Sequence, residues 1–314
     1  MSIDDVNLTD ADLYEEGPPH ALYAGLRKQE PVQWNSRGFW SVTRDADVAA
    51  VSRDTETFSS YEGGIFLNPD QVNTLEVNRN LLLFKDPPEH TKYRQILQKA
   101  FVPHSVRGIE DQIRALVTRT LDRVIEAGRC DFVPDIAVPV PLGVLAELLG
   151  LPEEDIPKLR RWTDEIEEAQ ISDESAAGFP TLTEMSAYLM EQIASQVESG
   201  QDSLVTTMRA AEVDGEKLTD LEVLVFFALL VFAGNDTTRN TASGGMLALL
   251  EHPAQWQMLC EQQDLIPQAV EEILRYTSVV NYFARTAMRD TELGGSQIKK
   301  GDKLLLWYTS ASRD

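Results

Sequence analysis

The stretch Leu230-Val-Phe-Ala-Gly-Asn-Asp-Thr-Thr-Arg-Asn240 changes from apolar to polar in the middle of one long predicted helix. Thr219-x-x-Glu222 is a capping box that opens this helix, and Pro253 closes it. Gly234 weakens the helix locally, and the hydroxyl of Thr237 can bond the carbonyl one turn earlier. Ala233 and Thr237 therefore share a face with little bulk, which a flat ligand can approach closely. Asp236 beside Thr237 places an acid next to an alcohol, the two parts of a proton relay.

The same stretch has a simpler interpretation, in which the helix leaves the core and its polar residues are solvated. Taken by itself, the stretch fits that interpretation better. Three further patterns are also weak, because each of them, taken alone, has a simple structural interpretation. Glu272 and Arg275 are spaced to pair on a helix, but most such pairs are surface salt bridges. His90 and Arg94 lie one helical turn apart and can hold an anion, or can be merely solvated.

The third pattern is a single cation in a predicted strand. Arg285 lies between Phe283-Ala and Thr286-Ala, so it is either a cation turned toward a buried site or an arginine on an edge strand.

Helical periodicity dominates the rest of the chain, and the fold class is mainly α with a small β region. Strand patterns occur only near the two ends: an early hairpin and two late strands. The expected strands are 31–34, 39–42, 283–289 and 303–308. The expected helices begin at Asp86, whose side chain is the predicted N-cap, and near residues 105, 141, 153, 181, 220 and 267. The last of these is expected to bury Ile266, Ala269, Val270, Ile273 and Leu274.

Composition excludes several classes of function. The chain has 314 residues, 51 acidic and 28 basic, for a net charge of −23. Such an acidic protein is a poor partner for nucleic acid or anionic membranes. Cys130 and Cys260 form no metal or disulfide pattern, and the histidines have no metal-ligand spacing. The longest apolar run, 223–233, is shorter than the ~20 residues that cross a membrane. We expect a cytoplasmic protein without a membrane anchor.

The joint order of the motifs resembles the cytochrome P450 family. Asp86-Pro-Pro-Glu-His-Thr-x-x-Arg94 comes first, followed by Ala233-Gly-x-Asp-Thr-Thr238, Glu272-x-x-Arg275 and Phe283-x-Arg-Thr-Ala287. The resemblance runs from about residue 20 to residue 314 and implies one P450 domain over residues 1–314. It also implies haem b as cofactor and a monooxygenase that inserts one atom of dioxygen into a C–H bond. Electrons are expected from a separate ferredoxin and ferredoxin reductase.

The resemblance assigns roles to residues of this sequence. His90, Arg94 and Arg285 bind the haem propionates, and Ala233 lies against the haem. Asp236 and Thr237 deliver protons during dioxygen activation. Glu272 and Arg275 are structural and hold the haem-binding core. The positions that usually face the substrate are Leu229, Phe232, Ala233 and Val280. The details of the motifs resemble the branch that oxidises sterol side chains, terpenoids and branched fatty chains.

One element of the family pattern is missing from this sequence. The family places its iron ligand in a Phe-Gly-x-Gly-x-His-x-Cys-x-Gly loop near the C-terminus, and neither Cys130 nor Cys260 lies in such a loop. We therefore expect a P450 fold that is incomplete at the C-terminus, lacks the cysteine-ligand loop and the helix after it, has no metal ligand and is inactive as given.

Two other functions were compared with this interpretation. Helical terpene cyclases also carry Asn-Asp on a long helix, but they need Ser and Glu where this chain has Arg239 and Ser243, so that class is rejected. A non-catalytic helical protein that binds apolar ligands stays open as the alternative.

Overall fold

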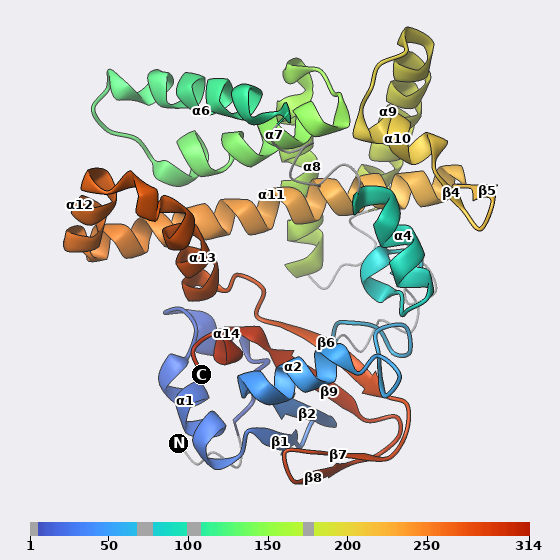
Figure 1. Cartoon of the computed structure of the whole chain (residues 1–314), viewed down its shortest axis with the longest axis vertical. Coiled ribbons are helices and arrows are strands. Elements are labelled where there is room, and N and C mark those ends of the chain that lie inside the picture. Colours follow the sequence, from blue (N-terminus) through green and yellow to red (C-terminus); the bar gives the residue numbers. More distant parts are fainter. Residues whose placement is uncertain (1–5, 68–77, 99–107, 172–178) are drawn as a thin grey trace. The chain divides into compact units, whose positions relative to one another are not determined.

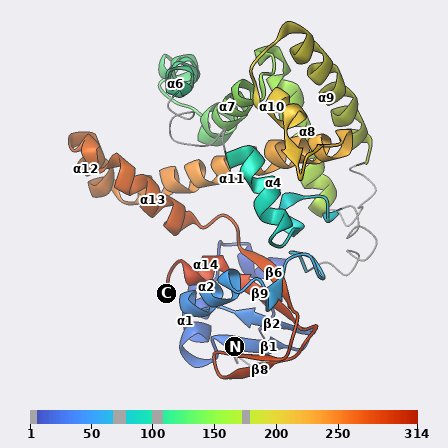
Figure 2. The ribbon, with the colours of Figure 1, turned by 45° about the vertical axis from the view of Figure 1, so that its right-hand side comes forward.

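The computed structural model describes residues 6–67, 78–98, 108–171 and 179–314. The chain divides into two compact units, one made of residues 1–90 and 248–314 and the other of residues 91–247 (Figure 1, Figure 2). Each has a distinct composition, since the first contains the main sheet and the second is almost entirely helical.

A five-stranded mixed sheet forms the centre of the first unit (Figure 1). Its strand order is β1-β2-β9-β6-β3, in which β2 and β9 run parallel and the other neighbours antiparallel. The strands are β1 (Val32–Asn35), β2 (Phe39–Val42), β3 (Phe58–Ser59), β6 (Tyr282–Ala287) and β9 (Lys303–Trp307), and a separate hairpin pairs β7 (Thr291–Leu293) with β8 (Ser296–Ile298). The early hairpin and both late strands agree with the sequence prediction.

The sheet is covered on both faces. Side chains along a strand alternate between faces, yet all four residues of the run Leu304-Leu-Leu-Trp307 are buried. Alternate members of the run belong to two buried clusters, one with α2 (Asp45–Arg53) and the other with α1 (His20–Gln29). A strand that is buried on both sides reads as a continuous apolar run, which explains this part of the sequence.

The first unit also contains α12 (Pro253–Glu261) and α13 (Ile266–Thr277), neither of which has a buried residue. The prediction that α13 buries an apolar stripe is wrong: Ile266, Val270 and Leu274 are 47–49% exposed. Hydrogen bonds join the C-terminal end of α13 to residues 312 and 313, but they leave these apolar side chains exposed. Short turns complete the unit: η2 (Ala11–Tyr14), η3 (Leu82–Phe84), η6 (Gln263–Leu265) and α14 (Tyr308–Ala311).

The second unit is helical apart from one short hairpin (Figure 2). Its helices are α6 (Glu110–Ile125), α7 (Pro139–Leu149), α8 (Ile156–Ile171), α9 (Phe179–Ser199), α10 (Leu204–Ala210) and most of α11 (Asp220–Glu251), with shorter turns η4 (Val133–Ala137) and η5 (Glu153–Asp155). The hairpin pairs β4 (Glu212–Val213) with β5 (Glu216–Lys217). The prediction that strands occur only near the two ends of the chain is therefore wrong. The start predicted near residue 105 lies outside the described residues.

Two predicted helix starts have different outcomes. The capping box before α11 is confirmed, because Thr219 N donates to Glu222 Oε2 at 2.8 Å and Glu222 N donates to Thr219 Oγ1 at 3.2 Å. The other start is α4 (Glu89–Gln98), for which Asp86 is not the side-chain cap. The carboxylate of Asp86 accepts a hydrogen bond from Ser59 Oγ and another from Ser60 N, the second at 2.8 Å. It therefore fixes the loop after β3 and does not cap α4.

By length and composition α11 could also cross a membrane. The core helix of a soluble protein passes the same test, so the feature alone does not assign a membrane location.

Candidate active site

The two faces of α11 differ in burial. Every fourth residue from position 223 is buried: Val223, Phe227, Val231 and Asn235. The half-buried row Leu229, Ala233 and Thr237 is offset from it by two positions. Two residues turn an α-helix by about 200°, so the two rows lie on opposite sides of α11. The buried row packs into the second unit, and the half-buried row faces away from that packing.

The α11 residues predicted for substrate contact and proton delivery share the half-buried side. They are spaced at i, i+3, i+4, i+7 and i+8, the spacing of one helix face: Leu229, Phe232, Ala233, Asp236 and Thr237. The structure therefore brings an apolar half-turn and a polar half-turn to one side of α11. The hydroxyl Oγ1 of Thr237 donates to the carbonyl of Ala233 at 2.7 Å, as predicted. Its own lone pairs can still accept a hydrogen bond from a ligand.

The sequence prediction missed neighbours on α11 that hold the Asp236 carboxylate. Arg239 Nη2 forms an ion pair with Asp236 Oδ1, and Asn240 Nδ2 donates to the same oxygen at 3.3 Å. The signal was present, since partners at i+3 and i+4 are the neighbours of a helical side chain. The side chain of Asp236 is 32% exposed, so solvent still reaches this carboxylate.

His90 and Arg94 lie one turn apart on α4, as predicted. His90 is half-buried and Arg94 is exposed. The boundary between the two units falls directly after His90, so only the helix itself relates the two side chains. Their joint action on an anion stays a prediction.

Arg285 lies on β6, which has β9 on one side and β3 on the other. It is therefore not on an edge strand. Its Nη1 donates to the carbonyl of Ala284 at 2.8 Å, and the guanidinium hydrogen bonds to the hydroxyl of Tyr308. Burial raises the pKa of Tyr308, and the contact with Arg285 opposes that rise. Val280 is half-buried in the segment between α13 and β6.

Glu272 and Arg275 form a two-pronged ion pair on α13. Arg275 Nε donates to Glu272 Oε2 at 2.7 Å and Nη2 to Oε1 at 2.5 Å. The remaining nitrogen, Nη1, donates to the carbonyl of Ser312 at 2.7 Å, which joins α13 to the C-terminal turn. The hydrogen bond from Arg275 holds the pKa of Glu272 below its usual value. Both side chains are exposed, so the pair adds little stability. Its role in holding a haem-binding core stays a prediction.

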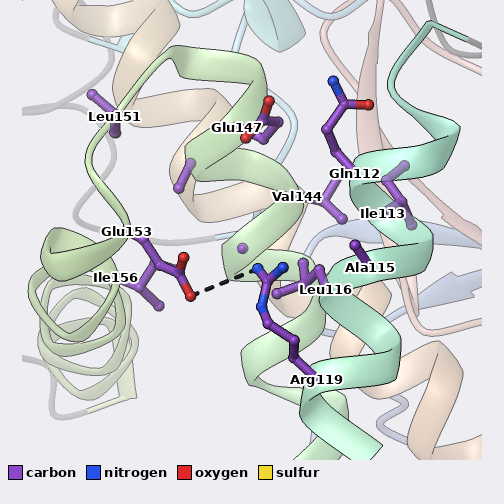
Figure 3. Close-up of a pocket in the computed structure, with 12 residues that line it drawn as sticks. Gln112, Ile113, Ala115, Leu116, Arg119, Val144, Glu147, Leu151, Glu153 and Ile156 are labelled. Atoms are coloured by element: carbon purple, nitrogen blue, oxygen red, sulfur yellow. Dashed lines mark ion pairs between the residues drawn. The ribbon is translucent and has the colours of Figure 1, made fainter.

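A cavity of about 230 Å³ lies elsewhere in the second unit, between α6 and α7 (Figure 3). Leu116, Val144 and Ile156 line it, and an ion pair between Arg119 and Glu153, with nitrogen and oxygen 3.7 Å apart, lies beside it. None of the predicted site residues contributes to its lining. The cavity is therefore separate from the half-buried face of α11.

Comparison with known proteins identifies the family. A profile of the cytochrome P450 family matches residues 179–314. The chain is 36% identical to the steroid C26-monooxygenase of Mycobacterium tuberculosis over 98% of this chain and 74% of that protein. It is 35% identical to the linalool 8-monooxygenase of Pseudomonas putida over 98% of this chain and 79% of that protein. Among solved structures, a Mycobacterium marinum cytochrome P450 in complex with pseudoionone has a TM-score of 0.85 and 34% identity, with 94% of this chain and 76% of that chain covered.

The chain belongs to the cytochrome P450 family, whose members are haem-dependent monooxygenases. The P450 fold, the mainly helical class and the bacterial sterol- and terpenoid-oxidising branch that the motifs predicted are all confirmed. The family cofactor is haem b, which has two propionate carboxylates and an iron that takes an axial protein ligand.

The two parts of this cofactor need different partners. Carboxylates pair with cations, and the role of His90, Arg94 and Arg285 as those cations stays a prediction. The iron takes a thiolate in this family; the two cysteines of this sequence, Cys130 and Cys260, are exposed and neither lies in the family's cysteine loop. Within the described residues no cluster of three or more His, Cys, Asp or Glu side chains exists. The axial ligand that the family pattern includes is therefore neither of these two cysteines.

Proposed function

We propose that the half-buried face of α11 is the reaction face of a monooxygenase that hydroxylates apolar molecules. The observation that carries this proposal is the common face of Leu229, Phe232 and Ala233 with Asp236 and Thr237. Apolar side chains orient an apolar substrate, and the acid and alcohol next to them handle protons. Bound haem supplies the oxidation chemistry, the reduction of dioxygen and the insertion of one oxygen atom.

The protein's own part is to hold protons at defined atoms and to exclude water. The hydroxyl proton of Thr237 is occupied by the carbonyl of Ala233, so its oxygen acts as an acceptor toward the reaction face. Asp236, the residue before Thr237, is partly exposed, so it can exchange a proton with solvent and pass it inward. A carboxyl that is held by Arg239 and Asn240 keeps its position during that exchange.

The substrate class follows from the same face together with the relatives. Leu229, Phe232 and Val280 are apolar, and the named relatives act on a steroid and on linalool. We propose that the substrate is a sterol side chain, a terpenoid or a branched fatty chain. His90, Arg94 and Arg285 would hold the haem propionates, with Ala233 against the ring, in one P450 domain.

The electron donor and the location belong to the same proposal. A separate ferredoxin and its reductase are the proposed donors, as the family resemblance implies. The polar turn in the middle of α11 and the net charge of −23 support a cytoplasmic protein without an anchor.

Substrate titration tests this proposal. The experiment uses the extended protein, defined as this sequence followed by the cysteine-loop segment of the Mycobacterium tuberculosis relative. Sterols and terpenoids are expected to change the haem spin state, which is read from the absorption spectrum. Leu229→Asn should weaken that binding roughly tenfold or more, because a buried leucine contributes about 1.5–3 kcal/mol.

The matched control is Leu221→Asn, since Leu221 lies on the same helix but is 55% exposed. It should leave binding unchanged. A spin-state change caused only by polar metabolites, or equal losses in both variants, would remove the apolar face from the site.

A further inference from the structure

The first unit contains a row of oxidisable aromatic side chains that has no part in the reaction as described so far. The row connects η2, α1, β9 and β6, and its members in order are Tyr14, Tyr23, Trp307 and Tyr282. The hydroxyls of Tyr14 and Tyr23 are 2.8 Å apart. The ring centroid of Trp307 is 6.1 Å from that of Tyr23 and 4.8 Å from that of Tyr282. Each side chain therefore contacts the next one in the row.

The two inner members are buried and the two outer members are half-buried. Tyr23 is 0% and Trp307 is 1% exposed, and both belong to the buried cluster on the α1 side of the sheet. Tyr14 and Tyr282 pack against that cluster, but solvent reaches part of each side chain. The row therefore passes through the core of the first unit and has a partly accessible ring at each end.

Packing does not explain the polar atom of the buried indole. Nε1 of Trp307 is buried and has no hydrogen-bond partner among the described residues. A buried N–H without a partner destabilises the fold, and a phenylalanine at this position would fill the core without that cost. A redox role is one of the explanations for a buried polar group that a protein leaves unsatisfied.

The hydrogen bonds of the two linked phenols have a definite direction. Tyr14 donates its only hydroxyl proton to the carbonyl of Leu8 at 2.9 Å, so Tyr23 is the donor in the bond between the two hydroxyls. Burial raises the pKa of Tyr23, so this phenol keeps its proton. Oxidation makes a phenol strongly acidic, and the half-buried Tyr14 can release that proton to water. Tyr14 is therefore the end at which the loss of an electron and the loss of a proton can occur together.

We propose that this row of four residues carries oxidising equivalents through the first unit, from Tyr282 to Tyr14. A one-electron oxidant formed from dioxygen first removes an electron from Tyr282, whose hydroxyl proton goes to water. Trp307 then returns an electron to Tyr282, which takes up a proton again. Tyr23 reduces the oxidised Trp307, and Tyr14 reduces the oxidised Tyr23. Tyr14 is left as a neutral radical, its proton is released to water, and the other three side chains are restored.

A reductant in solution completes the sequence. A soluble thiol gives a hydrogen atom to the Tyr14 radical, so the phenol is restored and the thiol becomes a thiyl radical. The choice of Tyr282 as the starting end rests on the proposed function, because Arg285 lies three residues further along β6 and is proposed to hold a propionate. The row would then remove oxidising equivalents from β6 before they damage this strand.

A light-driven oxidant attached at one end of the row tests the proposal in the full chain without haem. Cys130 and Cys260 are replaced by serine, and the exposed position next to Tyr282 is changed by Asn281→Cys to carry a ruthenium tris(bipyridine) complex. A flash with a cobalt(III) electron acceptor oxidises the complex, which then takes one electron from the protein. A phenolic probe couples to tyrosyl radicals, and peptide mass spectrometry locates the label. We expect light-dependent label on Tyr14.

Variants of the buried indole separate electron transfer from packing. Trp307→Phe keeps a buried aromatic ring that is not oxidised under these conditions, so the label on Tyr14 should fall to the level of an unilluminated sample. Trp307→Tyr provides an oxidisable ring again and should restore the label. Trp162→Phe is the matched control, because Trp162 is also 0% exposed but belongs to the other unit. It should leave the label on Tyr14 unchanged.

A second break in the row and an internal reference complete the test. Tyr23→Phe removes one oxygen atom and should also abolish the label on Tyr14; circular dichroism confirms that each variant is folded. Tyr61 is 40% exposed and lies outside the row, so its label measures oxidant that has diffused away from the complex. The proposal is overturned if Tyr14 is not labelled in the parent protein, or if its label persists in either folded phenylalanine variant. Such a failure leaves the proposed function intact, because haem, substrate and turnover have no part in the measurement.

Discussion

Thr237→Ala in the extended protein is expected to divert electrons from product to peroxide. Product formed per NAD(P)H should fall by roughly 10²-fold, the usual contribution of a positioned proton-transfer group. The reason is that the hydroxyl fixed by the carbonyl of Ala233 is the acceptor on the reaction face. Substrate affinity should change little, because the methyl and hydroxyl of one half-buried threonine add little apolar contact.

The controls for this prediction come from the same turn. Thr237→Ser keeps the hydroxyl and should stay close to wild type. Thr238→Ala removes an exposed hydroxyl next to the site and should also have no effect. Asp236→Asn keeps the shape and removes the acid, so it should slow turnover with less peroxide than Thr237→Ala. Wild-type coupling in both Thr237→Ala and Asp236→Asn would show that the pair is only the polar part of a helix.

The second large effect is expected on haem retention. Replacing His90, Arg94 and Arg285 by alanine in the extended protein should speed haem loss, because each charge-assisted hydrogen bond contributes about 1.5–3 kcal/mol. Each single variant should therefore lose haem roughly ten- to a hundredfold faster, and the triple variant faster still. The measurement is the rate of haem transfer to an excess of a haem-scavenging apoglobin.

Arg114→Ala is the matched control for these variants. Arg114 is an exposed arginine on α6 whose partner, Glu110, lies one turn earlier at 3.0 Å. Its loss removes one positive charge, as each single arginine variant does, but should leave haem retention unchanged. If the triple variant retains haem like the control, the three residues do not bind the propionates.

The sequence predicted the parts of the fold that short-range patterns determine. The capping box at Thr219, the hairpin of β1 and β2 and the bond from Thr237 to Ala233 depend on residues close together in the chain. Their geometry follows from spacing alone. The family followed from the order of motifs spread over most of the chain.

The errors arose where long-range packing decides. Amphipathic spacing predicted a buried stripe on α13, but spacing cannot say whether anything covers that stripe. The carboxylate of Asp86 seemed a helix cap from its position, yet it bonds a loop 26 residues earlier. The contact of Asn235 with Thr163 joins residues 72 positions apart, and no local pattern indicates it.

The most direct test of the central claim is the origin of the oxygen atom in the product. The extended protein is incubated with a sterol or terpenoid that changes its spin state, with its electron donors, under ¹⁸O₂ in ordinary water. A monooxygenase places one labelled oxygen atom in the hydroxylated product, and repeating the reaction with labelled water and ordinary dioxygen should give no label. Label that comes from water, or a substrate that is released unchanged while NAD(P)H is consumed, would contradict the assignment of a monooxygenase.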